Sequence, residues 1–367
     1  IVAWGHNFYG QTSVPAPNSG FVGVAAGGYH SLGLKADGSI VAWGNNGYGQ
    51  TNVPAPNADF IAIATGGDHS LGLKADGSIV AWGYNRYGQT NVPAPNTGFI
   101  AIAAGWLHSL GLKHDGSIVG WGYNGSGQIS VPAPNTGFVA VAAGLTQSLG
   151  LTADGSIEAW GSNSSGQTNV PAPNTGFIAV AAGLFHSLGL KANGSIVAWG
   201  SNGSGQTNVP APNAGFVAVA AGAYHSLGLK GNGSIVAWGS NDSGQTNFPA
   251  PNTGFVAVAA GGDHSLGLKT DGSILAWGDN WSGQTNVPAP NTSFVGVATG
   301  RNHSLALKVN GAIVAWGSNY YGQTSVPAPN TRFVGVAAGD SHSLGLRAYE
   351  FIVRGETTPT VNPTTRA

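Results

Sequence analysis

Imidazole side chains recur in this sequence at a spacing that calls for a test of metal chemistry. His-Ser-Leu triplets follow a 39-residue interval, and Gln147 takes the one place that lacks histidine: His30, His69, His108, His186, His225, His264, His303 and His342. A zinc ion needs three or four ligands converging at about 2 Å. Histidines spread one per repeat cannot converge in this way. We therefore predict no metal site and expect each ring to be buried and bonded to a neighbouring repeat's backbone, with Gln147 keeping part of that bonding.

Other chemical patterns are equally poor in this chain. Only 7% of the residues are charged, and 13 Lys+Arg nearly balance 14 Asp+Glu, so neither nucleic acid nor an anionic membrane has an electrostatic basis for binding. The segment GYNGSG (122–127) has paired glycines but no Lys-Ser/Thr, so it is no phosphate loop. The sequence contains no Cys or Met, and no titratable groups converge as an active site requires. We expect no enzyme activity, no cofactor and no membrane span.

The elements that carry these histidines are set by a strict internal repeat. A Trp-Gly pair returns every 39 residues, which makes nine units: Trp4, Trp43, Trp82, Trp121, Trp160, Trp199, Trp238, Trp277 and Trp316. Fixed self-similarity of this length is typical of solenoids, propellers and arrays. We expect the recurring Trp to pack between adjacent units and to serve as core.

Each unit contains three short apolar runs, which in the first complete unit are residues 21–27, 30–35 and 39–44. They are rich in β-branched and aromatic residues and are bounded by Gly, Asn, Asp and Pro, so they predict three strands. The Asp-Gly or Asn-Gly pair between the second and third runs favours a two-residue type I′ hairpin. The remaining Gly-, Asn- and Pro-rich segment predicts an irregular crossover in which VPAP is extended and stiff.

The stretch HSLGLKADGSIVAWGNNGYGQTNVPA (30–55) resembles the repeat of the regulator-of-chromosome-condensation type of β-propeller. The IVAWG and GQTNVPA segments are most similar to the propeller-type β-lactamase inhibitory protein of soil bacteria, and the resemblance covers residues 1–347. It implies an all-β propeller of three-stranded blades whose ring is closed by an N-terminal Trp strand. That inhibitor family has seven blades, whereas this chain has nine units, so a shared partner geometry does not follow.

The chain is expected to divide into a nine-unit propeller (1–347), a surplus strand-like segment (348–355) and a Thr/Pro-rich tail (356–367). The sequence contains nine first strands and nine second strands but ten candidate third strands. The tenth candidate is RAYEFIVRG (347–355), which aligns with residues 35–43, the segment that ends at Trp43. If residues 1–5 close the ring, Phe351, Ile352 and Val353 are free to add to another molecule's sheet edge. Two alternatives are that the segment packs on its own disc or that it closes the ring itself.

The repeats differ most in two short slots, one after AAG and one after WG, which strand direction places on the same face of the disc. Aromatic residues and arginines concentrate in these slots, and across the expected closure they form a mostly contiguous arc. Drift in unconstrained loops would not favour aromatics, and the bias towards Tyr, Trp and Arg is that of an interface hot region. The predicted binding residues are Phe8, Tyr9, Tyr29, Tyr48, Tyr84, Arg86, Tyr87, Trp106, Tyr123, Trp281, Arg301, Tyr320 and Tyr321.

A rigid scaffold with variable loops gathered on one face is typical of recognition proteins. We therefore expect a non-catalytic binding scaffold for a protein or polymer. The alternatives are a self-assembling structural protein that donates its C-terminal strand, and an inhibitor of a secreted enzyme such as a β-lactamase. The absence of Cys and the Gly- and Asn-rich composition favour an extracellular or cell-surface location.

Overall fold

The computed structural model describes residues 1–183, 185–338 and 342–347, and these form nine three-stranded antiparallel sheets. The first strands of the repeats are β2 (Phe21–Ala26), β5 (Phe60–Thr65), β8 (Phe99–Ala104), β11 (Phe138–Ala143), β14 (Phe177–Ala182), β17 (Phe216–Ala221), β20 (Phe255–Ala260), β23 (Phe294–Thr299) and β26 (Phe333–Ala338). The second strands are β3 (His30–Lys35), β6 (His69–Lys74), β9 (His108–Lys113), β12 (Gln147–Thr152), β15 (His186–Lys191), β18 (His225–Lys230), β21 (His264–Lys269), β24 (His303–Lys308) and β27 (His342–Arg347). The third strands are β4 (Ile40–Gly44), β7 (Ile79–Gly83), β10 (Ile118–Gly122), β13 (Ile157–Gly161), β16 (Ile196–Gly200), β19 (Ile235–Gly239), β22 (Ile274–Gly278), β25 (Ile313–Gly317) and the N-terminal β1 (Val2–Gly5).

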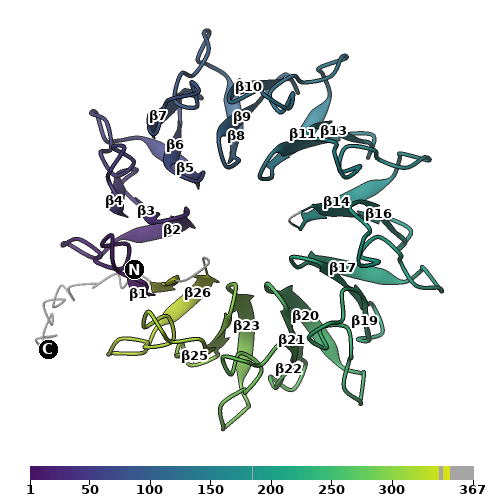
Figure 1. Cartoon of the computed structure of the whole chain (residues 1–367). Helices are drawn as coiled ribbons and strands as arrows, with labels where there is room; N and C mark the ends of the chain where they lie inside the picture. The colour runs from purple at the N-terminus through teal and green to yellow at the C-terminus, as the bar shows by residue number, and fades with distance from the viewer. Residues whose placement is uncertain (184, 339–341, 348–367) are drawn as a thin grey trace, which may run out of the picture.

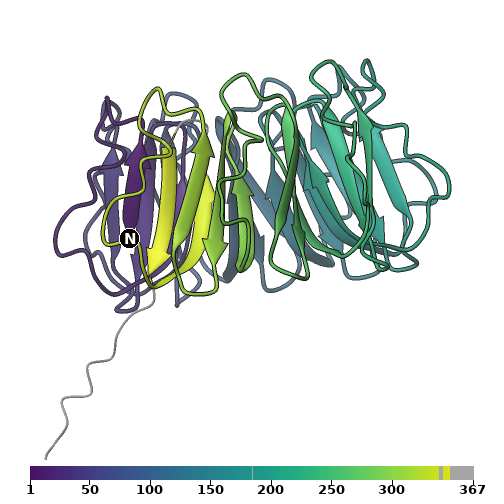
Figure 2. The same cartoon turned by 90° about the horizontal axis from the view of Figure 1, so that it is seen from below.

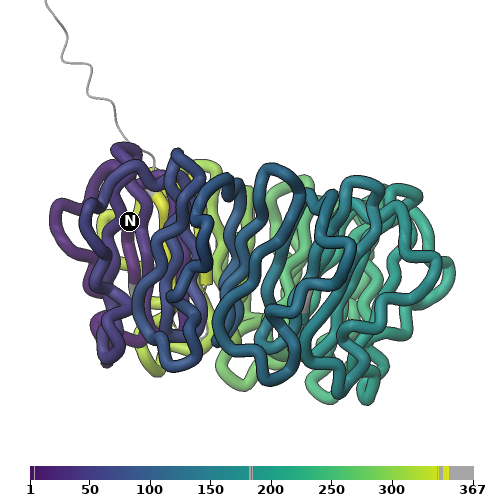
Figure 3. The backbone as a smooth tube through the Cα atoms, turned by 90° about the horizontal axis from the view of Figure 1, so that it is seen from above, coloured from purple at the N-terminus to yellow at the C-terminus, as the bar shows by residue number. Residues whose placement is uncertain are grey.

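The nine sheets stand as blades around one axis, with the first strand of each repeat innermost (Figure 1). Blade 1 is β2–β3–β4, and blades 2 to 8 follow in chain order. Figure 2 and Figure 3 show the disc from its edge, with the loops gathered at its two ends. We call the end with the slots after the first and third strands the variable face, and the end with the hairpins between the second and third strands the turn face. The predicted nine-bladed propeller is confirmed.

Blade 9 joins the two ends of the chain. Strand β1 pairs antiparallel with β27, with Val2 opposite Gly345 and Gly5 opposite His342. Ile1 is buried and packs in one cluster with Phe21 and Trp43 of blade 1. The N-terminal strand therefore closes the ring, as expected, and the third-strand place in blade 9 is taken. The predicted surplus segment, with Phe351, Ile352 and Val353, lies outside the described residues.

The hairpin at the turn face differs from the prediction. Only the glycine of each Asp-Gly pair has a positive φ, 77° at Gly38, whereas a type I′ turn needs two such residues. The amide of Gly38 donates to the carbonyl of Lys35 and the amide of Lys35 to that of Ser39, which is the three-residue loop with a type I turn and a G1 bulge. Asp37 completes the loop by accepting from the amide and hydroxyl of Ser39. The type I′ prediction is therefore wrong.

The crossover segments contain a feature that the sequence did not predict. In all nine repeats the Ala-Pro peptide of VPAP is cis, as at Ala55-Pro56. The following Asn57 side chain bonds both the amide and the carbonyl of Ile40, at 2.7 Å each. The side-chain amide thus satisfies the outer edge of the third strand where it begins, and it fixes the crossover against that edge.

The core lies between adjacent blades, as the recurring Trp predicts. Leu71, Leu73 and Ile79 of blade 2 pack with Phe99 and Trp121 of blade 3. The indole nitrogen of Trp121 also donates to the backbone carbonyl of a buried crossover glutamine, Gln89, at 2.9 Å. The same arrangement recurs around the disc. In blades 1 to 8 the Trp therefore fastens its blade to the crossover that precedes it.

The histidines form a belt of bonds between blades, but their acceptor is not the backbone that we predicted. His69 Nε2 lies 2.9 Å from the Ser109 hydroxyl of the next blade, and that hydroxyl donates to the carbonyl of Gln89. Because the hydroxyl proton is used there, His69 donates from Nε2. Burial lowers the pKa of His69 to about 3, so the ring is neutral and Nδ1 is unprotonated. A Cβ at Gly66 would lie 2.5 Å from Nδ1, so only glycine leaves room for the ring.

Gln147 does not replace this bond. Its carbonyl oxygen accepts from the amide of Thr146, while its amide nitrogen and the Ser187 hydroxyl in the next blade have no partner among the described residues. The expectation that glutamine preserves part of the bonding to the next blade is therefore wrong. The Gln147 side chain turns back to the amide of the residue before it, so the belt is interrupted between blades 4 and 5.

Replacing Gln147 with histidine is expected to repair the belt. The new ring would reach the unpartnered Ser187 hydroxyl, and a buried hydrogen bond of this kind is worth about 1 kcal/mol. Urea unfolding at neutral pH should show this gain in Gln147→His but not in Gln147→Ala. Equal or lower stability of Gln147→His would contradict the expected bond.

Candidate functional site

In blades 1 to 8 the two variable slots lie together on the variable face, as strand direction predicts. The amide of Asn45, which follows β4, donates to the carbonyl of Tyr29, which precedes β3, at 2.9 Å. Tyr84 and Asp68 are joined in the same way in blade 2. Loops that are 16 residues apart in sequence are thus held side by side at the end of one blade, on rigid strands.

The aromatic side chains at the ring closure form one connected group, which we call the closure cluster: His6, Phe8, Tyr9, Tyr29, Tyr320 and Tyr321. The rings of His6 and Tyr321 lie 4.3 Å apart edge to face, and those of Tyr9 and Tyr29 lie 5.3 Å apart. Phe8 and Tyr320 are 82% and 87% exposed, so a large apolar area faces solvent. The cluster brings together residues from both ends of the chain.

A second group, the tyrosine row, lies over blades 1 to 3 and consists of Tyr48, Tyr84, Tyr87 and Tyr123. Consecutive ring centroids are 4.7, 6.2 and 5.0 Å apart, all in edge-to-face geometry. The Arg86 guanidinium lies 5.9 Å from the Tyr87 ring. The row is therefore a continuous, preorganised aromatic surface, which the sequence predicted as part of the arc.

Two tryptophans of the predicted arc have different settings. Trp106 is half exposed and lies across the glycines of the two preceding blades, since a Cβ on Gly67 would be 3.1 Å from its indole ring and one on Gly28 would be 3.8 Å away. Trp281 is 96% exposed and borders a shallow hollow with Asp242 and Asp279. No ring contact joins Trp281 to the other aromatic residues of the described chain. The arc is therefore broken at Trp281.

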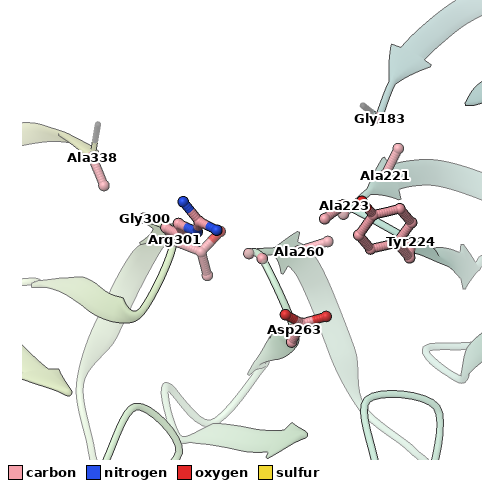
Figure 4. Close-up of a pocket in the computed structure, with 13 residues that line it drawn as sticks. Gly183, Ala221, Ala223, Tyr224, Ala260, Asp263, Gly300, Arg301 and Ala338 are labelled. Carbon is pink, nitrogen blue, oxygen red and sulfur yellow. The ribbon is translucent and has the colours of Figure 1, made fainter. Parts of the chain in front are cut away.

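Two hollows open at the inner ends of the blades. One of 340 Å³ is lined by Trp106, Arg301 and members of the closure cluster. The other, of 510 Å³, lies over blades 5 to 9, where Figure 4 shows Tyr224, Asp263 and Arg301 on three neighbouring blades with small Ala and Gly residues between them. Arg301 contributes to both hollows. Their walls offer aromatic faces and isolated charges, which suits binding by shape and contact.

The carboxyl groups at this face have altered acidity. Burial raises the pKa of Asp68. Burial also raises the pKa of Asp263, and the neighbouring Asp279 acts in the same direction, while the charge of Arg301 opposes the rise. Asp263 has a hydrogen bond from the Gln245 side chain at 3.2 Å, and no base or nucleophile is placed against it among the described residues. These shifts follow from packing at the blade ends.

The structure adds three aromatic residues that the predicted arc lacks. His6 lies at the centre of the closure cluster. Phe185 and Tyr224 are 39% and 41% exposed in blades 5 and 6, with ring centroids 6.5 Å apart. Both occupy slots after AAG, in a part of the chain where Ser and Gly dominate the second slot. The aromatic residue types at these two slot positions could have been read from the sequence. With them, the aromatic surface extends further around the disc than predicted.

Searches for a metal site and for a helix that could cross a membrane find neither over residues 1–183, 185–338 and 342–347. No group of three or more His, Cys, Asp or Glu is arranged to hold a metal ion there. No helix in this part of the structure is long and apolar enough to cross a bilayer.

Comparison with solved structures finds similar propellers. Prp20p from Saccharomyces cerevisiae superposes with a TM-score of 0.53 at 17% identity, over 95% of this chain and 91% of that chain. Yeast RCC1 (Prp20) bound to Kap60 gives 0.53 and 17%, over 95% and 89%. The ectodomain of the Physcomitrella patens receptor kinase CR4 gives 0.49 and 23%, over 81% and 74%. The likeness to the two Prp20 structures concerns the fold alone.

A search among curated proteins found no significant match. The sequence profile of the regulator of chromosome condensation (RCC1) repeat, in contrast, matches most of the chain in eight segments, residues 21–50, 60–89, 99–128, 138–167, 177–206, 216–245, 255–284 and 294–323. Each segment runs from the first strand to the crossover glutamine, so it includes the His-Ser and Trp-Gly positions that hold the blades together. This chain therefore belongs to the RCC1 repeat family.

Proposed function

We propose that this protein is a non-catalytic binding scaffold that recognises a protein or polymer through the aromatic residues of its variable face. The observation that carries the proposal is the exposure of preorganised rings in the closure cluster and the tyrosine row. Rigid aromatic side chains lose little conformational entropy on contact and dominate the binding energy of many interfaces. The recurring Trp and His side chains are buried in the core. The choice of partner can therefore vary through the slots, whose residues differ between repeats.

Similar structures support the proposal that the partner is a protein. Among the similar structures, Prp20p has binding properties towards Gsp1p and histones, and yeast RCC1 is bound to Kap60. Gsp1p, histones and Kap60 are named as partners of those proteins only. This chain shares the disc architecture but differs in its slots, so we infer a macromolecular partner that is selected by its own aromatic arc. An extracellular or cell-surface location, as the composition favours, is part of this proposal.

Removing the arc's anchors is expected to abolish capture of the partner. Replacing Trp106, Tyr87 and Tyr321 with alanine should cost about 2 kcal/mol or more for each true anchor. A pull-down with the unaltered chain identifies the partner, and calorimetry then compares the variants. A triple variant at exposed serines of blades 4 to 6, Ser164→Ala, Ser204→Ala and Ser243→Ala, serves as the control. Equal affinity of the aromatic variant and the control would refute the assignment.

A second candidate function is self-assembly by donation of the C-terminal strand. The observation in its favour is that β1 is the third strand of blade 9. That position is therefore not open to Phe351, Ile352 and Val353. Deleting residues 348–367 and comparing particles by light scattering tests it. A truncated chain that assembles like the full chain contradicts strand donation. Inhibition of a secreted enzyme such as a β-lactamase is the third candidate, and a direct inhibition assay tests it.

A further inference from the structure

The larger hollow of the variable face contains two opposite charges that do not pair with each other. It has a volume of 510 Å³ and includes Asp263 of blade 7 and Arg301 of blade 8. The charge of Arg301 acts on Asp263 through space, but no ion pair or hydrogen bond joins these two side chains in the described part of the chain. A cavity of this size with small apolar walls and a few placed polar groups is the usual form of a small-molecule site.

Backbone hydrogen bonds between blades fix the residues that carry these charges. The amide of Ala223 donates to the carbonyl of Gly262 at 3.4 Å, and the amide of Gly262 donates to the carbonyl of Arg301 at 3.3 Å. Tyr224 and Asp263 directly follow the two donors in the sequence. Tyr224, Asp263 and Arg301 are therefore held on the neighbouring blades 6, 7 and 8, with small Ala and Gly residues between them (Figure 4).

The Arg301 side chain keeps its guanidinium free. A Cβ built on Gly262 would lie 3.4 Å from Cγ of Arg301, so the arginine stem packs over the glycine that precedes Asp263. The exposed guanidinium beyond this stem has no hydrogen-bond partner among the described residues. Its N–H donors form a planar fork that matches the two oxygens of a carboxylate. Arg301 therefore offers a complete carboxylate-binding group at the edge of the hollow.

Asp263 lies where the local charge is negative. Its carboxylate is partly buried and accepts a hydrogen bond from the Gln245 side chain at 3.2 Å. Burial raises the pKa of Asp263, and the charges of Asp279 and Asp242 act in the same direction against the single charge of Arg301. A positive ligand group would offset this repulsion and donate hydrogen bonds to the carboxylate. This part of the hollow is therefore complementary to an ammonium group.

Tyr224 completes the hollow with an apolar wall. Its ring is 41% exposed, and the wall beside it consists of Ala221, Ala223 and Ala260. These alanine side chains offer no polar group, and the flat face of the tyrosine ring favours contact with apolar or aromatic groups. The hollow thus combines a carboxylate, a guanidinium and an apolar surface.

We propose that this hollow binds a small zwitterion of the α-amino-acid class with an apolar side chain. Arg301 pairs with the carboxylate of the ligand, Asp263 accepts hydrogen bonds from its ammonium group, and Tyr224 packs against its side chain. A ligand with a single charge would leave one of the two protein charges unpaired when it covers the hollow. The site takes a small molecule, so it goes beyond the proposed recognition of a macromolecule by the aromatic arc.

Blade 2 provides a comparison within the same chain. Asp68 follows Gly67 as Asp263 follows Gly262, and burial raises the pKa of Asp68 too. The next blade, however, presents Trp106 at the position of Arg301, and its indole ring covers Gly67. Blade 2 therefore has the carboxylate without the guanidinium, and we expect no zwitterion site there.

Three probes that differ in their charged groups test the proposal: phenylalanine, phenethylamine, which lacks the carboxylate, and phenylpropanoate, which lacks the ammonium group. NMR titration of the full chain gives the three dissociation constants. Phenylalanine is expected to bind about ten-fold or more tightly than either of the other probes, because each of them loses one hydrogen-bonded charge pair.

Variants of the two charged residues separate the two contacts. Arg301→Gln is expected to bind phenylalanine no better than phenethylamine, and Asp263→Asn is expected to bind it no better than phenylpropanoate. The matched controls are Arg86→Gln and Asp68→Asn, which make the same changes elsewhere on the variable face and should keep the preference for phenylalanine. Tyr224→Ala is expected to weaken the binding of all three probes alike.

Three results would overturn the proposal. The first is that phenylalanine does not bind the unaltered chain up to its limit of solubility. The second is that either singly charged probe binds as tightly as phenylalanine, because one of the two charges then contributes nothing. The third is a preference for phenylalanine that persists in Arg301→Gln or Asp263→Asn, because the ligand then lies elsewhere. These titrations need no macromolecular partner, so their failure is distinct from failure of the proposed binding function.

Discussion

Lowering the pH from 7 to 5 is expected to unfold the disc in one steep transition. Burial lowers the pKa of seven belt histidines from 6.5 to about 3 or 4: His30, His69, His108, His186, His225, His264 and His303. Each ring is therefore neutral in the fold, while the unfolded chain takes up a proton below pH 6.5. The stability is fully present above that pH and is lost as the pH falls towards the folded pKa.

The size of this effect follows from proton linkage. At pH 5 each such histidine favours the unfolded chain by about 2 kcal/mol, so seven sum to an order of 10 kcal/mol, which rivals a whole domain's stability of about 5–15 kcal/mol. The slope of unfolding free energy against pH should correspond to uptake of nearly seven protons. Urea titrations at several pH values measure it. The variant His108→Gln, which copies the natural Gln147, should be less stable at neutral pH and take up one proton fewer.

A stability that is constant between pH 7 and 5 would contradict the neutral belt. The turn-face carboxylates do not confuse the test, because their lowered pKa values change the stability only in a lower pH range. Hydrogen bonds from Ser39 lower the pKa of Asp37 below its ordinary value of 3.8, so its contribution is lost only as the pH falls below that value. The belt and the hairpins thus respond in separate pH windows.

Truncating Trp121 to alanine is expected to destabilise the protein by about 3–5 kcal/mol, as for other large core aromatics. Its ring is 3% exposed and packs between blades 2 and 3, and its indole nitrogen donates to Gln89, whose carbonyl would keep only the Ser109 hydroxyl. Urea unfolding measures the loss. The matched control is Trp281→Ala, at 96% exposure, which should change stability by less than about 0.5 kcal/mol.

The conservative variant Trp121→Phe separates packing from hydrogen bonding. It keeps most of the apolar contact with Phe99 and loses the bond to Gln89, so a smaller loss of about 1–2 kcal/mol is expected. Equal stability of Trp121→Ala and Trp281→Ala would show that the recurring tryptophans are not the interblade core.

The sequence predicted the repeat and the three strands because these depend on periodicity, and the resemblance to the RCC1-type propeller implied the closure by residues 1–5. A residue type that returns in register, such as Trp121, has the same neighbours in every blade. The errors concern contacts that periodicity does not specify. Sequence could not tell whether His69 bonds a carbonyl or the Ser109 hydroxyl, since both recur with the same interval. The turn type failed because Asp-Gly is compatible with two hairpin geometries, and the φ of Asp37, which is not positive, distinguishes them.

For the candidate site, the slots and their common face followed from strand direction, but the grouping of side chains did not. The closure cluster joins His6, which follows blade 9, to Tyr321, which follows blade 8, at 4.3 Å, and Tyr9 to Tyr29 of blade 1 at 5.3 Å, so it depends on how blade 9 is placed between its two neighbours. Trp106 could only be placed once Gly67 was seen beneath it.

The pairing of β1 with β27 has a consequence for how the chain folds. Apart from Trp106, which also reaches Gly28 two blades back, the interblade contacts described above join neighbouring repeats, so a partly folded chain grows as a one-dimensional array in which nucleation can begin at any blade. Such an array has two bare ends that would need capping. Here the pairing of Val2 with Gly345 joins residues that are far apart in sequence, yet the entropy of closure grows only with the logarithm of the loop length. Closing the circle removes both bare ends at once, so the array needs no cap and the last step of folding makes all nine interfaces cooperative.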